Sequence, residues 1–318
     1  KTSIIKESIQ KSKIPYIYLD LSRISLSPES FSIEFVGNVC YALIEQKAPY
    51  KNFLDIDFLI SLKKYLKPVS YDILSLIQNE TQKIKPNQKL MLDLAFKFLE
   101  SHDRKIIVVL DNIEHLLDLN NFSQIKDITS LLTFKQKNTL YITASSYPTL
   151  VQKSFKDFET ITIENLDITK ISDLLSKKGV TNKETIQKIY KLTSGNPYLV
   201  SLLLENNDKD IEEFLLKELL NKNGKIYSHC QLLLENYLSR TSGKTLSKII
   251  LRVIANKQGL KLSQIARKIF RPAPVTKSLL ERLIASDAIT KKDNLYYLSN
   301  STLAIWISST SSNLDSLN

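Results

Sequence analysis

The sequence predicts an α/β fold with a mostly parallel sheet, followed by a purely helical region and a small domain of three helices and a β-hairpin. In the first half, short apolar runs typical of buried strands alternate with helical segments. Beyond Asp167 the pattern is almost entirely helical. Near the C-terminus, Asp293-Asn294 separates two short strand-like runs, which is a hairpin signal.

Length and composition indicate an ordinary intracellular protein. The 318 residues suffice for two or three domains, and 43% hydrophobic residues can fill their cores. Cys40 and Cys230 are too few for a disulfide framework or a zinc site, which favours a reducing compartment. We see no signal peptide and no apolar stretch near the roughly eighteen residues that cross a bilayer. We therefore expect a cytoplasmic protein with no membrane partner.

The central strand of the predicted sheet is Ile106–Asp111, an unbroken apolar run that ends in a carboxylate. Such a run fits a strand buried on both faces. Ligands of parallel sheets bind beyond the carboxyl ends of the strands, so Asp111 would lie where a metal ion and phosphates bind. The alternative is a core strand that ends in a surface aspartate.

The chain opens on Lys1-Thr2, before a helical pattern and a strand over Ile14–Leu19 that leads to Asp20. This order suggests a phosphate-binding loop cut just after its glycines, in which Lys1 reaches the β- and γ-phosphates and the Thr2 hydroxyl holds Mg²⁺. Because the chain starts at Lys1 and not at Met, we expect a fragment or a processed product. Lys-Thr is also a common pair without any such role.

The segments between the strands are expected to be helical. Ser27-Pro28-Glu29 is a helix start, with a capping residue, a proline and an acid in the first turn, and the helix should reach about Gln46. Further helices are expected at Phe53–Leu66, Val69–Lys83, Asn87–Ser101 and Phe122–Gln136. Two more strands are expected at Leu140–Ser146 and Thr160–Ile163. His102 is read as a capping or surface residue.

The second half begins with five expected helices, at Ile168–Lys178, Lys183–Thr193, Pro197–Asn206, Ile211–Asn221 and Lys225–Ser239. Thr241-Ser242-Gly243 is the best linker. His229 and Cys230 lie together on a helix without partner ligands, so a metal site there is not expected.

The last region reads as a winged helix. The expected helices are Leu246–Asn256, Leu262–Phe270 and Val275–Ala285, and the hairpin strands are Ile289–Lys292 and Leu295–Leu298. A short helix over Ser301–Ile307 would pack Trp306 on this domain. Residues 309–318 are expected to form a flexible tail.

The charge is concentrated in the same region. The segment from Lys244 to Lys292 contains twelve Lys and Arg residues, and its only acidic residues are Glu281 and Asp287. Its net charge is therefore +10, out of +11 for the whole chain. This is the footprint of a nucleic-acid-binding module. The second helix of a helix-turn-helix enters the major groove, and the wing lies near phosphates. The expected contacts with double-stranded DNA are Thr276, Lys277, Ser278, Arg282, Lys291 and Lys292. The alternative is a winged helix used for protein contacts.

Four segments together resemble a known family. Leu110–Leu117 looks like the Walker B segment of STAND-class P-loop ATPases, relatives of AAA+ proteins, and Thr143–Ser146 resembles their sensor 1 strand end. Ile163–Leu166 resembles the link into the helical lid, and Leu192–Leu199 is similar to the lid's Gly-Asn-Pro motif. The chain most resembles the archaeal ATPase family, with a more distant relation to archaeal replication-origin initiators.

The resemblance implies a P-loop NTPase core with a RecA-like parallel sheet, an α-helical lid and a C-terminal winged-helix domain. The implied domains are residues 1–165, 166–240 and 243–308, with the core incomplete within the Walker A motif. The implied cofactors are ATP and Mg²⁺. The implied contacts with them are Lys1, Thr2, Asp111, Ser145 or Ser146, and Gly195-Asn196-Pro197. Thr2 and Asp111 would hold the metal, and one of the two serines would sense the γ-phosphate.

One departure from the family pattern affects hydrolysis. AAA+ ATPases usually place glutamate directly after the Walker B aspartate, but this chain has Asn112. An amide can orient water and cannot accept its proton, and Glu114 is the only nearby substitute. We therefore expect a slowly hydrolysing, nucleotide-dependent switch. The alternative is a non-catalytic regulatory or scaffold protein, with self-association or a protein partner. Arg23 and Arg104 are read as surface arginines rather than arginine fingers.

Overall fold

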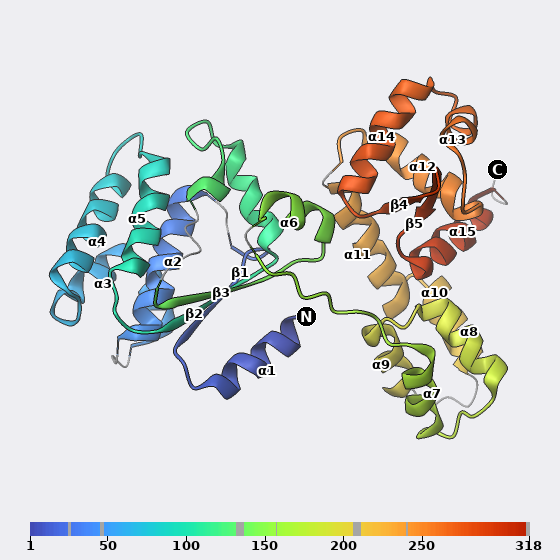
Figure 1. The fold of residues 1–318 in the computed structure, drawn as a ribbon, viewed down its shortest axis with the longest axis horizontal. Helices are drawn as coiled ribbons and strands as arrows, with labels where there is room; N and C mark the ends of the chain where they lie inside the picture. Colours follow the sequence, from blue (N-terminus) through green and yellow to red (C-terminus); the bar gives the residue numbers. More distant parts are fainter. Residues whose placement is uncertain are drawn as a thin grey trace. The chain divides into compact units, whose positions relative to one another are not determined.

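The protein is described by a computed structural model that covers residues 1–24, 27–44, 48–131, 137–156, 158–205, 211–239 and 241–315. The chain divides into two compact units, Lys1–Phe158 and Glu159–Asn318. The first unit is built on a sheet, and the second is built mainly of helices (Figure 1).

The sheet of the first unit is parallel, as predicted. Its strands are β1 (Tyr16–Asp20), β2 (Ile106–Asp111) and β3 (Thr139–Ala144), in the order β1-β2-β3. The register pairs Asp20 with Asp111 and Asp111 with Ala144. Since all three strands run the same way, the residues that follow them gather at one edge of the sheet.

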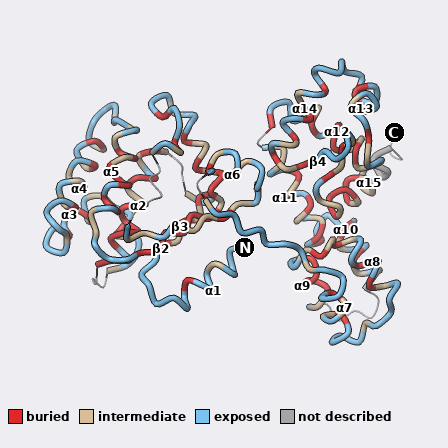
Figure 2. The backbone as a smooth tube through the Cα atoms, viewed as in Figure 1, coloured by how far each residue is buried: buried red, intermediate tan, exposed pale blue. Residues whose placement is uncertain are grey.

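Strand β2 is buried on both faces, which explains its unbroken apolar sequence (Figure 2). Ile106, Val108 and Leu110 join the main core, to which α2 (Pro28–Leu43) and α5 (Gln88–Glu100) also contribute. Ile107 and Val109 point the other way and pack with Ile9 of α1 (Thr2–Ser12). Helices therefore cover both faces of the sheet, as in other α/β cores.

Helix α2 begins as the sequence predicts. The Ser27 hydroxyl accepts a hydrogen bond from the Ser30 backbone N–H at 3.1 Å, and Pro28 occupies the first turn. The backbone of Phe53 passes so close to the helix that a β-carbon at Gly37 would lie 1.9 Å from its carbonyl oxygen. The elements between α2 and α5 are η1 (Tyr50–Leu54), α3 (Ile56–Ser61), η2 (Lys63–Tyr65) and α4 (Pro68–Thr81).

Two predicted elements of this region are wrong. Residues 122–131 contain only the short 3-10 helix η4 (Ile128–Leu131) in place of the helix predicted over Phe122–Gln136, whose last five residues lie outside the described ones. Polar side chains interrupt this segment: the Asn120 amide oxygen accepts from the Ile128 N–H at 2.7 Å, and the Asp127 carboxylate accepts from the Thr129 N–H at 3.0 Å.

The strand predicted at Thr160–Ile163 is also absent, and these residues are extended without a strand partner. Ile161 is 85% exposed, so its β-branched side chain does not contribute to a sheet face. His102 is a third correction. Its imidazole is half-buried and packs edge-on against Phe98, and burial lowers the pKa of the ring.

The second unit contains helices and one β-hairpin. The first helices are α7 (Ile168–Ser176), α8 (Lys183–Thr193), α9 (Pro197–Glu205), α10 (Ile211–Leu220) and α11 (Lys225–Ser239). The later elements are α12 (Lys244–Asn256), α13 (Leu262–Lys268), α14 (Ala273–Ala285), β4 (Ile289–Lys292), β5 (Leu295–Leu298) and α15 (Ser301–Asp315). The predicted end of α9 at Asn206 lies outside the described residues. One hydrophobic core runs through both groups of helices.

The hairpin has the predicted bounds. Asp293 and Asn294 both have positive φ angles, 49° and 60°, which matches a two-residue turn that follows the strand twist. Leu260, just before α13, forms a β-bridge with Tyr296 of β5. The hairpin is thereby tied to the helices that precede it.

Helix α15 corrects the predicted C-terminal boundary. It continues to Asp315, beyond the helix end predicted at Ile307. Trp306 packs edge-on against Tyr227 of α11, so its ring contacts a helix that precedes the linker. Within the described ranges, no helix has the length and apolar character needed to cross a bilayer.

Candidate functional site

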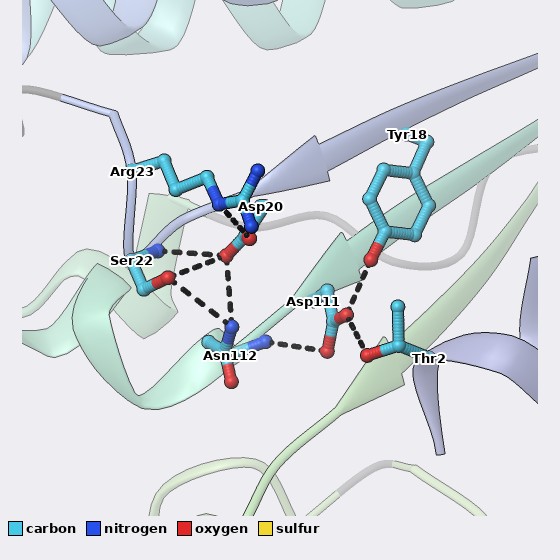
Figure 3. A network of polar contacts seen from close by, with 7 residues as sticks. All are labelled: Thr2, Tyr18, Asp20, Ser22, Arg23, Asp111 and Asn112. Atoms are coloured by element: carbon cyan, nitrogen blue, oxygen red, sulfur yellow. Dashed lines mark hydrogen bonds and ion pairs between the residues drawn. The ribbon is translucent and has the colours of Figure 1, made fainter. Parts of the chain in front are cut away.

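The carboxyl edge of the sheet brings together polar residues that are far apart in the sequence (Figure 3). Thr2 lies at the start of α1, Asp111 at the end of β2, and Ser145-Ser146 directly after β3. Lys1 joins them from the beginning of the chain. The parallel register is the cause, because it places the ends of β2 and β3 side by side.

Asp111 is the centre of this cluster and is 4% exposed. The Thr2 hydroxyl donates a hydrogen bond of 2.6 Å to its Oδ2 atom, and the Tyr18 hydroxyl donates to the same oxygen. The Asn112 backbone N–H donates to Oδ1 at 3.0 Å. Three donors therefore hold the carboxylate of Asp111 in one orientation.

Lys1 spans from the start of α1 to the end of β3. Its ammonium group donates to the Ser145 carbonyl oxygen and to the Ser146 hydroxyl, the latter at 3.2 Å. The Ser145 hydroxyl is engaged elsewhere, since it accepts from the Tyr147 N–H at 2.9 Å in the turn before α6 (Pro148–Ser154). Of the two serines, Ser146 thus presents its hydroxyl to Lys1.

Asn112 lies in the left-handed region, with φ 56° and ψ 48°. Asparagine adopts this conformation more readily than most residues. Its amide nitrogen donates to Asp20 Oδ1 at 2.8 Å and lies 3.4 Å from the Ser22 hydroxyl (Figure 3). The side chain is therefore held toward the end of β1. Glu114 is 2% exposed in the first turn of η3 (Ile113–Asn121), so it is buried in the fold.

Two residues of the cluster were not predicted from the sequence, Tyr18 and Asp20. They lie on one face of β1, two residues apart, and Asp20 pairs in register with Asp111. Burial, together with the hydrogen bond to the Asp111 carboxylate and its charge, raises the pKa of Tyr18 to about 12. Asp20 could have been found from its place at the end of β1, and the strand period puts Tyr18 on the same face as Asp20.

The charge of Asp20 is stabilised by its neighbours. Burial alone would raise the pKa of its carboxyl, but hydrogen bonds from Ser22 and Asn112 and the charge of Arg23 lower it. Arg23 Nε lies 3.1 Å from the Asp20 carboxylate. Asp20 is therefore a carboxylate with its own set of partners beside Asp111.

We expect Tyr18→Phe to lower the free energy of unfolding at neutral pH by about 1–2 kcal/mol, because it removes a hydrogen bond to an ionised carboxylate. In the native protein the tyrosine stays protonated up to a pKa of about 12, whereas an unfolded tyrosine titrates near 10. Its contribution is thus complete below about pH 10 and is lost as the pH rises through about 12. Denaturant unfolding at both ends of this range measures it.

Tyr16→Phe is the matched control, since Tyr16 lies on the same face of β1 two residues earlier. We expect that variant to keep the alkaline loss of stability of the unmodified protein. An equal alkaline loss in Tyr18→Phe would contradict the assignment of that loss to Tyr18.

Two residues of the cluster are of the type that could hold a magnesium ion. The Thr2 hydroxyl and the Asp111 carboxylate face each other at 2.6 Å, and both are hard oxygen ligands of the kind Mg²⁺ prefers. Among the described residues, no group of three or more His, Cys, Asp or Glu side chains forms a metal cage. Mg²⁺ usually takes one or two protein ligands and completes its shell with water and phosphate oxygens.

The Gly195-Asn196-Pro197 motif belongs to the second unit and starts α9. The Asn196 side chain accepts from the Tyr198 N–H at 2.9 Å, and Pro197 takes the first helical position. Gly195 has φ 72°, and its carbonyl accepts from the Leu166 N–H at 2.8 Å. A β-carbon at Gly195 would lie 1.9 Å from the Leu166 carbonyl oxygen, so this approach requires glycine. The motif therefore joins the start of α9 to the segment before α7.

One of the predicted DNA contacts is wrong. Thr276 is completely buried in α14, and its hydroxyl donates to the Pro272 carbonyl at 3.1 Å. Thr276 lies on the same buried face as Leu280 and Leu283, because the three residues are four and seven positions apart on the helix. Thr276 is thus a core residue of the second unit.

The other predicted DNA contacts reach the surface to different degrees. Lys277, Lys291 and Lys292 are exposed, and Ser278 is half-buried. Arg282 is exposed, but its guanidinium donates to the Ser242 hydroxyl at 2.6 Å and thereby braces the linker before α12. The lysines are therefore the clearest surface cations of this set.

The two arginines outside these clusters have structural partners. Arg104 donates to the Leu43 carbonyl oxygen at 3.0 Å, and Arg23 pairs with Asp20. Neither geometry gives a reason to treat them as arginine fingers.

Comparison with known proteins places the fold. No protein-family model and no curated protein matches the sequence. Among solved structures, the chain is similar to the Walker-type ATPase of Pyrococcus abyssi, with a TM-score of 0.60 and 18% identity over 96% of this chain and 87% of that one. A STAND protein with a tetratricopeptide repeat sensor from Pyrococcus horikoshii gives a TM-score of 0.31 at 15% identity, over 88% of this chain and 39% of that one. The first similarity shows that the chain shares the fold of that Walker-type ATPase.

Proposed function

We propose that this protein is an ATP-binding, slowly hydrolysing ATPase of the AAA+/STAND type, which acts as a nucleotide-dependent switch. The observation that carries the proposal is the contact of Thr2 with Asp111 at the carboxyl edge of a parallel sheet, with Lys1 and Ser146 beside it. A lysine, a hydroxyl and a carboxylate at that edge are the groups that bind phosphates and Mg²⁺.

Each residue has a distinct role in the proposal. The Lys1 ammonium neutralises the β- and γ-phosphates and exchanges its contacts with Ser145 and Ser146 for phosphate oxygens. The Thr2 hydroxyl and the Asp111 carboxylate hold Mg²⁺, which supplies charge neutralisation on the phosphates when bound. We assign the γ-phosphate contact to the Ser146 hydroxyl, because the Ser145 hydroxyl is engaged by the Tyr147 N–H.

Slow hydrolysis follows from the surroundings of the possible proton acceptors. The Asn112 amide is hydrogen-bonded to Asp20 and cannot accept a proton. Glu114 is buried, and Asp20 is paired with Arg23. The site therefore favours bound ATP over rapid turnover, which suits a switch.

A glutamate in place of Asn112 is not expected to produce a fast ATPase. Asn112→Glu places a longer side chain at φ 56°, removes the 2.8 Å hydrogen bond to Asp20 and adds a like charge beside that carboxylate. We expect a loss of about 1–3 kcal/mol in the free energy of unfolding and no rise in turnover. Phosphate release under saturating Mg–ATP measures the turnover.

Asn112→Gly is the control for the backbone, because glycine accepts the left-handed conformation. Similar turnover in this variant and in the unmodified protein would support a structural role for the amide. A more than tenfold acceleration by Asn112→Glu would contradict the proposed geometry of the site.

For the second unit, we propose a winged helix over residues 243–308 that binds double-stranded DNA, preceded by a lid over residues 166–240. The order α12, α13, α14, β4, β5 and the bridge between Leu260 and Tyr296 support a winged helix. The exposed Lys277, Lys291 and Lys292 support binding to phosphates.

The alternative is a regulatory or scaffold protein that uses the winged helix for protein contacts. It predicts no salt-dependent binding of duplex DNA and no dependence of stability on Mg–ATP. The high local charge between Lys244 and Lys292 favours the DNA-binding proposal.

A further inference from the structure

Phe270 lies in the turn between α13 and α14 with its side chain almost wholly in solvent. It is 86% exposed, although a phenylalanine ring is among the groups that gain most from burial. Its φ angle is 52°, in the left-handed region that favours glycine. Both its surroundings and its backbone conformation are thus unusual for this residue type.

The backbone conformation is imposed by the end of α13. The Arg271 N–H donates to the Ala266 carbonyl at 3.1 Å, and the Phe270 N–H donates to the Arg267 carbonyl at 3.3 Å. This pair of hydrogen bonds is a Schellman motif, in which Phe270 occupies the position that glycine usually takes. Phenylalanine therefore makes the turn less favourable than glycine would.

The same unit contains this motif with glycine at the corresponding position. At the end of α7, the Val180 N–H donates to the Leu175 carbonyl at 3.1 Å, and the Gly179 N–H donates to the Ser176 carbonyl at 2.9 Å. Gly179 has φ 81°. The contrast shows that the turn after α13 does not itself require an aromatic ring.

The chain on both sides of Phe270 is rich in cations. Between Lys261 and Leu280 the sequence contains no Asp or Glu. The exposed cations nearest to Phe270 along the chain are Arg267, Lys268, Arg271 and Lys277. Val275, at 44% exposure, adds a second apolar side chain at the start of α14. An exposed apolar side chain with cations before and after it in the sequence matches a polyanion that also offers apolar surface, which describes the grooves of duplex DNA.

We propose that Phe270 is a DNA-contacting residue, whose ring enters a groove and packs against base and sugar atoms while the flanking cations meet the phosphates. The inference rests on the proposed binding of duplex DNA by the second unit. It assigns to Phe270 an apolar contact that the basic residues cannot supply. The exposed ring and the unfavourable turn are then explained by binding and not by folding.

The decisive variant is Phe270→Gly, because binding and stability should change in opposite directions. Glycine suits the left-handed turn, so the melting temperature of the variant should equal or exceed that of the unmodified protein. The affinity for a fluorescently labelled, mixed-sequence duplex should fall about 10-fold. The slope of log affinity against log salt should stay the same, since no cation is removed.

Two further variants complete the test. Phe270→Trp keeps an aromatic ring and should bind duplex DNA within about threefold of the unmodified protein. Leu232→Ala removes another exposed apolar side chain, 57% exposed on α11, and should change neither affinity nor slope.

The outcomes separate this inference from the proposal beneath it. If the unmodified protein binds duplex DNA and Phe270→Gly binds it equally well, the role of Phe270 is overturned and DNA binding stands, with a protein partner as the better explanation of the exposed ring. If Phe270→Gly melts at a lower temperature, Phe270 is a structural residue and the inference also fails. If the unmodified protein shows no salt-dependent DNA binding, the DNA-binding proposal itself fails.

Discussion

Lys1→Ala is expected to weaken ATP binding by about 10- to 100-fold, the effect of removing one charge-assisted contact with phosphate. In the structure the Lys1 ammonium reaches the Ser146 hydroxyl at 3.2 Å, so it lies at the edge of the sheet where the phosphates would bind. The loss should be larger for ATP than for adenosine, which has no phosphates. Titration of the intact protein with a fluorescent ATP analogue and with adenosine measures both.

Lys11→Ala is a suitable control, because it removes the same charge from the far end of the same helix. Lys11 is exposed and forms an ion pair with Glu7, one turn earlier on α1, at 2.7 Å. We expect the affinity of the Lys11→Ala variant for ATP to stay within about twofold of that of the unmodified protein. Exposed ion pairs of this kind contribute little free energy. Equal ATP affinity in Lys1→Ala and Lys11→Ala would refute the assignment of Lys1 to the phosphates.

Reversal of two charges in the second unit should nearly abolish DNA binding. Lys277→Glu combined with Lys291→Glu changes one exposed residue of α14 and one of β4. We expect the affinity for duplex DNA to fall about 100-fold at moderate salt. The slope of log affinity against log salt concentration should become shallower by about 2. Fluorescence anisotropy across a salt series gives both quantities. Arg282 is left unchanged, because its contact with Ser242 supports the linker.

The control for this pair is Lys85→Glu combined with Lys89→Glu. Both residues are exposed in the first unit, and the substitutions change the net charge by the same amount. If this control weakens DNA binding as much as the α14 and β4 pair, binding depends on overall charge and the winged helix has no special part in it. ATP binding should be unaffected by either pair.

The sequence was most informative where burial and strand direction act together. The apolar run of Ile106–Asp111 required a strand buried on both faces, and a parallel sheet brings the ends of its strands to one edge. From these two facts the proximity of Asp111 and Ser146 could be predicted without coordinates, whereas Thr2 was expected there from the Lys1-Thr2 pattern. The helix starts at Ser27 and Asn196 were equally clear, because capping is a local interaction.

The sequence could not predict the features that depend on which side chains and strands meet in the folded protein. Thr276 was expected at the surface, but it lies on the face of α14 that packs into the core with Leu280 and Leu283. The left-handed backbone of Asn112 directs its amide to Asp20, which no residue pattern indicates. Thr160–Ile163 has strand-like residues, but it pairs with none of the strands in the part of the chain that the structure describes. These are tertiary effects that override local preference.

The magnesium dependence of ATP binding, compared between the unmodified protein and Asp111→Asn, is the most direct test of the proposed site. Asparagine keeps the size of the buried side chain and removes the charge that would hold the metal. Circular dichroism and thermal melting establish that the variant is folded. The account predicts that Mg²⁺ strengthens ATP binding by the unmodified protein and not by Asp111→Asn, while binding without Mg²⁺ is similar in the two. An equal strengthening by Mg²⁺ in both proteins would contradict it.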